Sequence, residues 1–516
     1  MEDYNQYFSF PIGEDQKKAF DALWRFVESN ERDVFILNGY AGTGKTSLIG
    51  GFIQKLYQNN KVIVKNYNKK SKDKMLYEVN VLASTGRAAK ILSDKTITKA
   101  KTIHSMLYKP TYIEEDTEVI QFELFALEDT FGDIRIYIVD EASMVGDIDN
   151  PTDSAAQFGE GNVLKDLFKF DPEGKFIFVG DPCQLNPVGQ KISPALEPEH
   201  LKQQYGKKVV VHTLNTIFRQ QGDNDILLAA TTIRKVWQKY VPDFTTHPRY
   251  GKQEIFTNLP LLGYQRIKTC MSESELVTQY TNLIREKGYS YSTMICHSNK
   301  ECATAGDIVR QMLHGRREHL IEGDLLLVTQ NNYLVDLVNG DLVEVKKILH
   351  STRTVRANMS FVRVEVVPLH TRNNINKSEE KEYITGDGYS LFMVEDILKQ
   401  GTLNLDTTQT KELMKDFIIR MEKRNIKPPK KHTKAGPDHP FFIALSKDPY
   451  MNALRATYGY ALTCHKAQGG EWEEVFINLA GNSLFARRGK ELYQWIYTAL
   501  TRAKEQLHLI TGRFVI

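Results

Sequence analysis

The sequence predicts an α/β protein built on parallel β-sheets, with helices covering both faces of each sheet. Short apolar, β-branched runs stand at 33–38, 79–83, 134–139 and 175–179, and stretches with helical spacing of apolar residues lie between them. A strand that is apolar along its whole length is typical of a parallel sheet buried on both faces. We therefore expect residues 1–222 to form one such domain.

The same alternation returns later in the chain. A strand is predicted at 291–296, and the α/β pattern resumes from about residue 451 to the end. Residues 223–340 and 451–516 are therefore expected to form a second parallel-sheet domain. Between 323 and 367, short β-like runs are separated by turns containing Asn and Gly. We expect a small β-barrel and a polar, basic segment inserted within 341–450.

A β-hairpin is expected within the first domain, at about 105–126. Residues 108–124 alternate polar and apolar side chains around the acidic turn Glu114-Glu115-Asp116. Tyr112 and Phe122 lie in this segment and are candidates for stacking against nucleobases.

Bulk composition excludes several classes of protein. No apolar run of the 516-residue chain approaches the roughly 18 residues that span a membrane. The acidic N-terminus carries no signal core, so a cytoplasmic location is expected. The five cysteines are scattered and odd in number, which favours reduced thiols over disulfides or a zinc site. A net charge of +3 does not reveal a nucleic-acid partner, although the basic stretches 61–74 and 420–434 could meet phosphates or simply be solvated.

The segment Gly39-Tyr40-Ala41-Gly42-Thr43-Gly44-Lys45-Thr46 matches the phosphate-loop pattern between a predicted strand and a predicted helix. Gly39, Gly42 and Gly44 let the backbone curl so that its N–H groups, with that of Thr43, face phosphate oxygens. Lys45 would reach the β- and γ-phosphates of ATP, and the Thr46 hydroxyl would bind Mg²⁺. This loop therefore predicts an ATP site with Mg²⁺ as cofactor.

Asp140 and Glu141 follow the strand predicted at 134–139. Asp140 would hold the metal ion, and Glu141 would orient or deprotonate the attacking water. Two acids at a strand end are often only solvated, but a phosphate loop in the same domain favours the catalytic interpretation. Gln16 precedes the first strand, where its amide could read the adenine edge or simply be an exposed helix residue.

Six further segments occur in a fixed order along the chain. They are Ala83 to Ala89, Thr102-Ile103-His104, Asp140 to Met144, Gly180 to Leu185, Thr463 to Trp472 and Tyr497 to Lys504. In this order they resemble the motifs of superfamily 1 DNA helicases, above all the RecD/Dda-like branch that includes the Pif-type helicases. The resemblance covers nearly the whole chain and is weakest at 223–272 and 370–450.

The resemblance implies two RecA-like domains that clamp ATP, a hairpin that acts as a wedge, and an SH3-like barrel. Gln184 would sense the nucleotide, Arg219 and Arg502 would reach the γ-phosphate, and Gly469 would lie near the nucleotide. Because Arg502 belongs to the second domain, hydrolysis would be linked to domain closure. Arg219 alone could instead be a surface ion-pair partner.

The resemblance also implies a DNA strand on the two domains. The positions that match strand contacts are Thr85, Gly86, His104, Asn339, Thr463 and His465. Hydroxyls, imidazoles and backbone N–H groups contact phosphates without reading sequence, so binding would tolerate any sequence. His104 could equally be a packed histidine.

The branch implies 5′-to-3′ movement on single-stranded DNA, and duplex DNA with a single-stranded tail as substrate. A monomer is expected, with replication, repair or recombination proteins as candidate partners. An RNA helicase or a translocase without unwinding is an alternative within the same enzyme class. A non-enzymatic DNA-binding subunit is disfavoured, because Lys45, Thr46, Asp140, Glu141, Gln184 and Arg502 are all intact.

Overall fold

The computed structural model of the chain describes residues 4–8, 10–29, 31, 33–58, 77–113, 120–124, 134–148, 156–159, 161–217, 225–242, 244–248, 251–254, 258–369, 383–430, 435–480, 489–510 and 515. The chain divides into two compact units. The first consists of Met1–Lys109, Phe122–Thr152 and Phe158–Asp223, and the second of Pro110–Gln121, Asp153–Gln157 and Asn224–Ile516.

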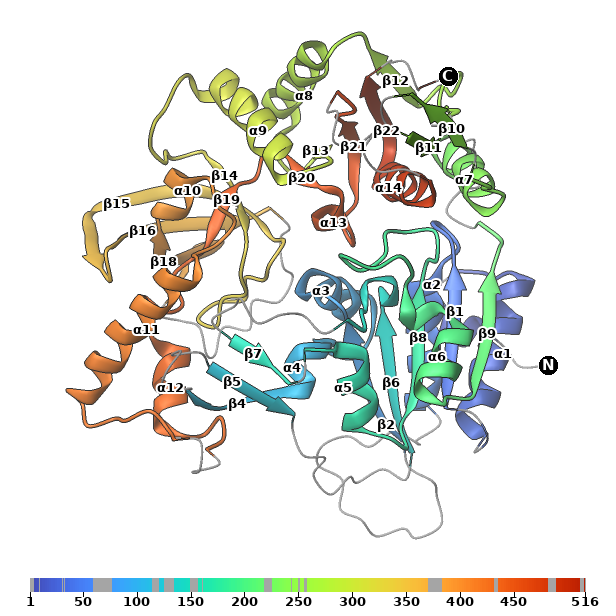
Figure 1. The fold of residues 1–516 in the computed structure, drawn as a ribbon, viewed down its shortest axis with the longest axis horizontal. Coiled ribbons are helices and arrows are strands. Elements are labelled where there is room, and N and C mark those ends of the chain that lie inside the picture. Colours follow the sequence, from blue (N-terminus) through green and yellow to red (C-terminus); the bar gives the residue numbers. More distant parts are fainter. Residues whose placement is uncertain are drawn as a thin grey trace. The chain divides into compact units, whose positions relative to one another are not determined.

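The first unit contains a parallel sheet with the strand order β3-β2-β6-β8-β1-β9 (Figure 1). Every pairing within it is parallel. The strands are β1 (Val34–Gly39), β2 (Tyr77–Ala83), β3 (Lys101–Thr102), β6 (Ile134–Asp140), β8 (Lys175–Gly180) and β9 (Val209–Leu214).

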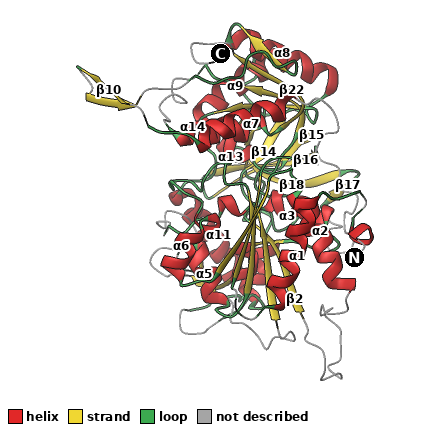
Figure 2. Cartoon of the chain, turned by 90° about the vertical axis from the view of Figure 1, so that its right-hand side faces the viewer, coloured by secondary structure: helices red, strands yellow, loops and turns green. Residues whose placement is uncertain are grey.

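Helices cover both faces of this sheet, as Figure 2 shows in an edge-on view. One face packs against α1 (Glu14–Glu28), α2 (Lys45–Gln58) and α3 (Gly86–Lys95). The other packs against α4 (Ile103–Leu107), α5 (Val163–Phe170) and α6 (Pro198–Tyr205). Short 3₁₀ turns lie at η1 (Tyr4–Tyr7), η2 (Ala142–Met144) and η3 (Pro194–Leu196).

The apolar run in β1 explains why both faces are covered. Successive side chains of a strand point to opposite faces, so Phe35 and Leu37 enter one core cluster while Val34 and Ile36 enter the other. All four side chains are fully buried. Such a strand is stable only between two layers of helices, as the sequence predicted.

The second unit contains another parallel sheet, with the order β12-β22-β21-β13-β20. Its strands are β12 (Ile267–Cys270), β13 (Ser292–Cys296), β20 (Leu462–Thr463), β21 (Trp472–Ile477) and β22 (Ala503–Ile510). The helices around it are α7 (Asp225–Gln238), α8 (Glu273–Lys287), α9 (Asn299–His314), α13 (Cys464–Ala467) and α14 (Lys490–Leu500). The predicted α/β class with two parallel-sheet domains is confirmed.

A separate six-stranded sheet of the second unit has the order β17-β18-β16-β15-β14-β19, and its pairings are antiparallel. Its strands are β14 (Leu325–Val328), β15 (Leu342–Arg356), β16 (Met359–Pro368), β17 (Ile384–Thr385), β18 (Gly388–Val394) and β19 (Ala456–Tyr458). This sheet begins earlier and ends later in the chain than the predicted insertion at 341–450, because β14 and β19 pair with each other.

The polar segment that follows β18 is helical in its described part. Its helices are α10 (Asp396–Gln400), α11 (Thr407–Glu422) and α12 (Pro440–Lys447). Arg420, at the start of the basic stretch 420–434, is bonded to the carboxylates of Asp416 and Asp448. The other basic stretch, 61–74, lies outside the described residues. A two-stranded antiparallel sheet of β10 (Phe244–His247) and β11 (Gly251–Glu254) was not expected from the sequence.

Two strands occupy the predicted hairpin segment, β4 (Tyr108–Ile113) and β5 (Ile120–Leu124), and a third, β7 (Ala156–Phe158), joins them in the order β4-β5-β7. The acidic turn between β4 and β5 lies outside the described residues. The Phe122 ring stacks on Phe158 with centroids 4.6 Å apart, so its ring already has a stacking partner within the chain.

No helix in the described part of the chain is long and apolar enough to cross a membrane.

Candidate functional site

The carboxyl ends of three adjacent strands in the first sheet carry the predicted nucleotide site. The order β6-β8-β1 places Asp140 at the end of β6, Gln184 just after β8, and the phosphate loop directly after β1. Carboxyl ends of parallel strands share one edge, and open α/β sheets bind ligands in the crevice outside that edge. Residues separated by more than 100 positions in sequence are thereby collected at one place.

The phosphate loop has the curled backbone that the sequence predicted. Gly42 and Gly44 have φ angles of 78° and 79°, in the left-handed region where glycine is favoured. A Cβ at Gly39 would lie 2.7 Å from Lys45 Cγ, so this position has no room for a side chain. The buried Thr43 hydroxyl donates to Tyr40 O at 2.8 Å, which closes the curl.

Lys45 begins α2 and folds back over the loop. Its Nζ lies 2.5 Å from Gly39 O and 3.4 Å from Tyr40 O, so the ammonium group is held above the loop backbone. Together with the N-terminal dipole of α2, this position concentrates positive potential where an anion would sit.

Asp140 and Thr46 form the candidate metal site. The Thr46 hydroxyl donates to Asp140 Oδ2 at 3.4 Å. Burial, followed by the negative charge of Glu141, raises the pKa of Asp140 to about 6, against the opposing effects of Lys45 and Thr46. An oxygen pair of this kind suits Mg²⁺, which is commonly held by one or two protein oxygens plus phosphates and water. The residues present therefore fit a nucleotide-bound Mg²⁺ ion.

Glu141 has a strained backbone. Its φ of 50° places a non-glycine residue in the left-handed region, and its N–H donates to Asp140 Oδ1 at 2.9 Å. Strain of this kind costs on the order of 1–3 kcal/mol and persists where the surroundings impose it.

Within the described residues no group of three or more His, Cys, Asp or Glu side chains could hold a metal ion.

The Gln16 amide, expected to read adenine, is bonded within the chain. The side chain is 1% exposed, with Oε1 accepting from Gly13 N and Nε2 donating to Thr43 O at 3.0 Å. Both amide atoms are therefore used inside the chain, one to cap α1 and one to hold the phosphate loop. The alternative of an exposed helix residue is wrong, because Gln16 is buried. The bond to Thr43 O spans 27 positions of the chain, so helical spacing does not reveal it.

Gln184 is buried after β8, and its backbone N–H donates to Asp181 O at 3.1 Å. Arg219 lies outside the described residues.

Arg502 follows α14 and is 6% exposed. Its guanidinium donates to Thr498 O at 3.0 Å, to Gly470 O at 3.3 Å and to Thr501 Oγ1 at 3.0 Å. The second unit thus holds this guanidinium by its own acceptors.

The Thr463 to Trp472 segment and Arg502 are neighbours in the second unit. Besides the bond from Arg502 to Gly470 O, Trp472 N donates to Arg502 O at 3.0 Å. Gly469, which the resemblance places near the nucleotide, has a φ of 75° that a side chain would disfavour. The structure thus brings together two segments that the sequence places about 30 residues apart.

Two of the predicted strand contacts are helix caps. Thr85 precedes α3 and accepts from Ala88 N at 3.2 Å, next to the buried Gly86. Thr463 precedes α13 and accepts from Lys466 N at 3.4 Å. Each threonine follows a strand of a parallel sheet, β2 in the first unit and β20 in the second. The two units therefore place matching groups at the carboxyl ends of their sheets.

Of the remaining predicted contacts, two are exposed and one is half-buried. His104 is exposed on α4, and its ring centroid lies 5.5 Å from that of Phe158 in an edge-on arrangement. His465 is half-buried in α13. Asn339 is exposed, and its backbone N–H donates to Asn331 Oδ1 at 2.9 Å.

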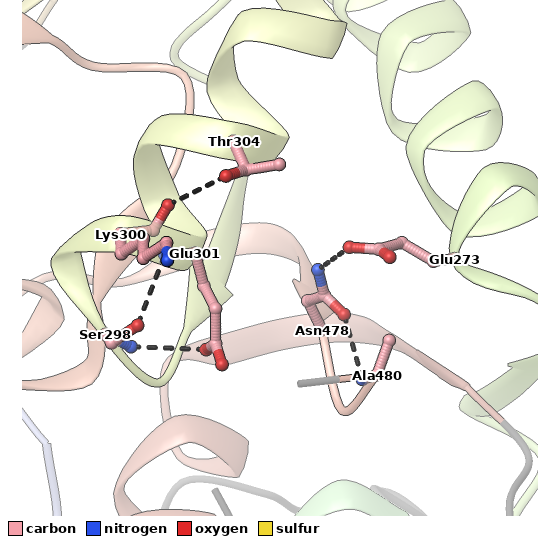
Figure 3. A pocket seen from close by; sticks show the side chains of 7 residues that line it. All are labelled: Glu273, Ser298, Lys300, Glu301, Thr304, Asn478 and Ala480. Atoms are coloured by element: carbon pink, nitrogen blue, oxygen red, sulfur yellow. Dashed lines mark hydrogen bonds between the residues drawn. The ribbon is translucent and has the colours of Figure 1, made fainter. Parts of the chain in front are cut away.

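A hollow of about 360 Å³ opens at the carboxyl ends of β13 and β21, and sequence reasoning did not identify it (Figure 3). It is lined by Glu273, Ser298, Lys300, Glu301, Thr304, Asn478 and Ala480. Asn478 donates to Glu273 at 2.6 Å, and Glu301 caps α9 with Ser298. The Ser298-x-x-Glu301 spacing is the capping signal that the sequence already contains.

Residues 12–239 match the family model of an AAA domain, and residues 458–510 match that of a UvrD-like helicase C-terminal domain. An uncharacterized protein of Acanthamoeba polyphaga mimivirus is 20% identical, over 95% of this chain and 98% of the relative. An uncharacterized protein of Methanocaldococcus jannaschii is 24% identical over 96% of this chain, which spans only 38% of that relative's length.

Solved structures similar to this chain include Pif1 helicase from Bacteroides in complex with ADP-AlF3 and ssDNA, at a TM-score of 0.43 and 16% identity over 98% of this chain and 95% of that one. Pif1 helicase from Candida albicans has a TM-score of 0.43 and 15% identity over 98% and 96% of the two chains. The AAA match contains the phosphate loop, Asp140 and Gln184, and the UvrD-like match contains Thr463, Gly469 and Arg502. An AAA domain followed by a UvrD-like helicase C-terminal domain supports an ATP-dependent helicase.

Proposed function

We propose that this protein is a DNA helicase of the Pif-type branch that moves 5′ to 3′ along a single strand and separates the duplex ahead of it. The observation that carries the proposal is the gathering of Lys45, Thr46, Asp140 and Glu141 at one sheet edge, in a chain that also has the helicase C-terminal domain. The 5′-to-3′ direction is supported by the resemblance of the Thr463 to Trp472 segment to that branch.

ATP with Mg²⁺ supplies the phosphoryl group whose transfer to water releases free energy. Lys45 and the N–H groups of the phosphate loop bind and neutralise the phosphates. Asp140 and Thr46 would hold the Mg²⁺ ion, and Glu141 would orient the attacking water and accept its proton. Gln184 senses the γ-phosphate, whereas Gln16 is assigned to holding the loop through Thr43 O and not to reading adenine.

Arg502 is the arginine of the second domain that stabilises charge on the transferred phosphoryl group. Its bonds to Gly470 O and Thr498 O support this role, because they hold the guanidinium in one orientation and tie it to the Thr463 to Trp472 segment. Arg219 is proposed for the same charge, with Gly469 close to the nucleotide. Because Arg502 is bonded to the Thr463 to Trp472 segment, a change of nucleotide state that moves Arg502 would also move Thr463 and His465.

The strand is DNA, contacted by Thr85, Gly86 and His104 in the first domain and by Asn339, Thr463 and His465 in the second. The pairing of β4 with β5 supports a wedge role for residues 105–126, and the antiparallel sheet supports an SH3-like subdomain. The printed names of the similar Pif1 structures include ssDNA and forked dsDNA, which agrees with these substrates.

Unwinding of matched duplexes with either a 5′ or a 3′ single-stranded tail tests the proposal. Strand separation that requires ATP and the 5′ tail is expected. Preference for the 3′ tail contradicts the branch assignment, and ATPase stimulation by RNA but not DNA would identify an RNA helicase. Hydrolysis on DNA without unwinding of either tail would identify a translocase.

A further inference from the structure

Arg455 is a buried cation that has no acidic partner among the described residues. It is 7% exposed and lies just before β19, where its carbonyl accepts from Thr329 N at 2.9 Å. Its only hydrogen-bond acceptors in the described structure are amide oxygens. Nη1 donates to Gln330 Oε1 at 2.7 Å and to Asn404 Oδ1 at 3.3 Å. Burial lowers the pKa of the Arg455 guanidinium to about 10, and no neighbouring charge opposes that shift.

Other arginines of the same unit show what a paired guanidinium looks like. Arg310, of similar burial, is bonded by both oxygens of Asp324 at 2.7 and 2.9 Å. Arg353 is bonded by both oxygens of Glu395 at 2.8 and 2.6 Å. Burying a charge is costly unless it is paired, because water no longer solvates it. Arg455 lacks such a carboxylate among the described residues, and only one of its nitrogens has an acceptor there, whereas the similarly buried Arg502 uses all three of its nitrogens.

The unused donors of Arg455 face an incomplete polar environment. Within the described residues, Nε and Nη2 have no acceptor in the chain, and neither atom is fully shielded from solvent, whereas Gln330 and Asn404 hold Nη1. Asn404 Nδ2 also donates to Gln330 Oε1 at 3.3 Å, so the two amides fix each other. Nearby in the chain, the buried Thr329 hydroxyl has no hydrogen-bond partner in the described structure. A ligand with several acceptor oxygens would satisfy the free donors of the guanidinium.

The surroundings point to the kind of ligand. Gln330 leads into the loop that carries Asn339, and Asn332 Nδ2 fastens this loop to Asn452 O at 2.6 Å, three residues before Arg455. In that loop Tyr333 is 67% exposed and offers a surface on which a base could stack. A guanidinium is the group that proteins use most for bidentate binding of phosphate.

We propose that Arg455, positioned by Gln330 and Asn404, binds a phosphate group at the end of the β14–β19 pair. The assignment of this phosphate group to the backbone of a bound nucleic-acid strand rests on the proposed function. A free phosphate ion offers the same chemistry, so the two sources are separated by experiment.

The decisive variant is Gln330→Glu in the full-length chain. It places a carboxylate oxygen where Oε1 now lies 2.7 Å from Nη1, and the built-in anion should replace the ligand. Gln400→Glu is the matched control, because it adds the same charge at an exposed position of α10 in the same unit. Asn404→Asp supplies the carboxylate from the other side if Gln330→Glu does not fold.

The first measurement is the thermal midpoint in sodium phosphate and in sodium chloride at equal ionic strength. A ligand that binds only the native state raises the midpoint by mass action. Phosphate bound at the phosphate loop should raise the thermal midpoint equally in all variants. The difference between variants therefore reports phosphate binding at Arg455. We expect wild type and Gln400→Glu to gain more from phosphate than Gln330→Glu, which should already be more stable in chloride.

The second measurement is binding of a labelled oligothymidylate by fluorescence anisotropy across salt concentrations. Loss of one phosphate contact should lower the magnitude of the slope of log K against log salt by about 0.7. A lower slope in Gln330→Glu assigns the site to the strand, and a loss in the phosphate measurement alone assigns it to a free ion. If both measurements match the control, Arg455 is structural and the proposal fails.

A wild-type chain that does not bind the oligothymidylate would contradict the proposed function alone. The phosphate measurement would still decide whether the Arg455 site exists.

Discussion

The two parallel sheets differ in the groups that lie at their strand ends. In the first unit, charged side chains and a strained loop gather at the carboxyl ends of β1, β6 and β8. In the second, the capping Thr463 ends β20, whereas Arg502 directly precedes β22 and its guanidinium is bonded within its own unit. On the proposed function, the first sheet binds and hydrolyses the nucleotide, and the second holds an arginine and a strand contact rigidly. If this division is correct, substitutions in the two sheets should have separable effects on nucleotide binding, on hydrolysis and on strand binding.

The largest effect is expected from Lys45→Ala in the first sheet. Removal of the ammonium held at 2.5 Å from Gly39 O should lower the hydrolysis rate on the order of 10³-fold or more, because the phosphates lose their main cation. Phosphate release measured at saturating DNA checks it. Lys17→Ala, an exposed lysine paired with Glu14, is the control and should behave like wild type. Loss of strand binding together with hydrolysis would point to misfolding.

Arg502→Ala should lower hydrolysis by roughly 10³-fold while leaving nucleotide affinity nearly unchanged, since an arginine of this kind acts mainly on the transition state. Binding of a fluorescent nucleotide and single-turnover hydrolysis separate the two effects. Arg502→Lys should not restore the rate, because one ammonium cannot reproduce the bonds to Thr498 O, Gly470 O and Thr501. Equal losses of affinity and rate would remove the distinction between the sheets.

Asp140→Asn should make the metal-free protein more stable at high pH. The pKa of Asp140 is raised to about 6 in the folded chain, so its ionised form opposes folding as pH rises from about 4 through 6. The shift corresponds to at most about 3 kcal/mol at pH 8 and to only about 0.5 kcal/mol at pH 4. Thermal midpoints in a chelator at both pH values measure this. A variant equally stabilised at pH 4 would show that charge is not the cause.

Gln16→Ala should weaken ATP binding by about tenfold, because the loop loses the bond from Nε2 to Thr43 O, worth about 1 kcal/mol, and its packing. The preference for ATP over GTP should not change, since both amide atoms are used within the chain. KM values for the two nucleotides decide the point. A change in their ratio would restore the adenine-reading role expected from the sequence.

The smallest effects are expected from a matched pair, Thr85→Val and Thr463→Val. Each removes a cap that accepts a backbone N–H, and loss of such a cap costs about 1 kcal/mol. Both should also weaken strand binding by a similar small factor if the two sheets contact the strand alike. Anisotropy titrations of both variants measure this, and an effect in one sheet alone would show that the strand is held asymmetrically.

The nucleotide site follows from sequence because its parts are local. A strand, a glycine-rich turn and a helix are specified by neighbouring residues, so Gly39 to Thr46 and Asp140-Glu141 stand where their patterns require. The two-faced burial of β1 is likewise a direct result of an uninterrupted apolar run. These features depend on hydrogen bonds and side-chain periodicity within about ten residues.

Other features depend on contacts between residues far apart in the chain, and only the tertiary structure decides them. Gln16 meets Thr43 across 27 positions, and the antiparallel sheet takes in β14 and β19 because these distant strands pair. Arg455 meets Gln330 across 125 positions, and nothing near it in sequence shows that its charge is buried without an acid. Composition and spacing specify which elements form, whereas burial and pairing of a single polar group are settled by the packing of those elements.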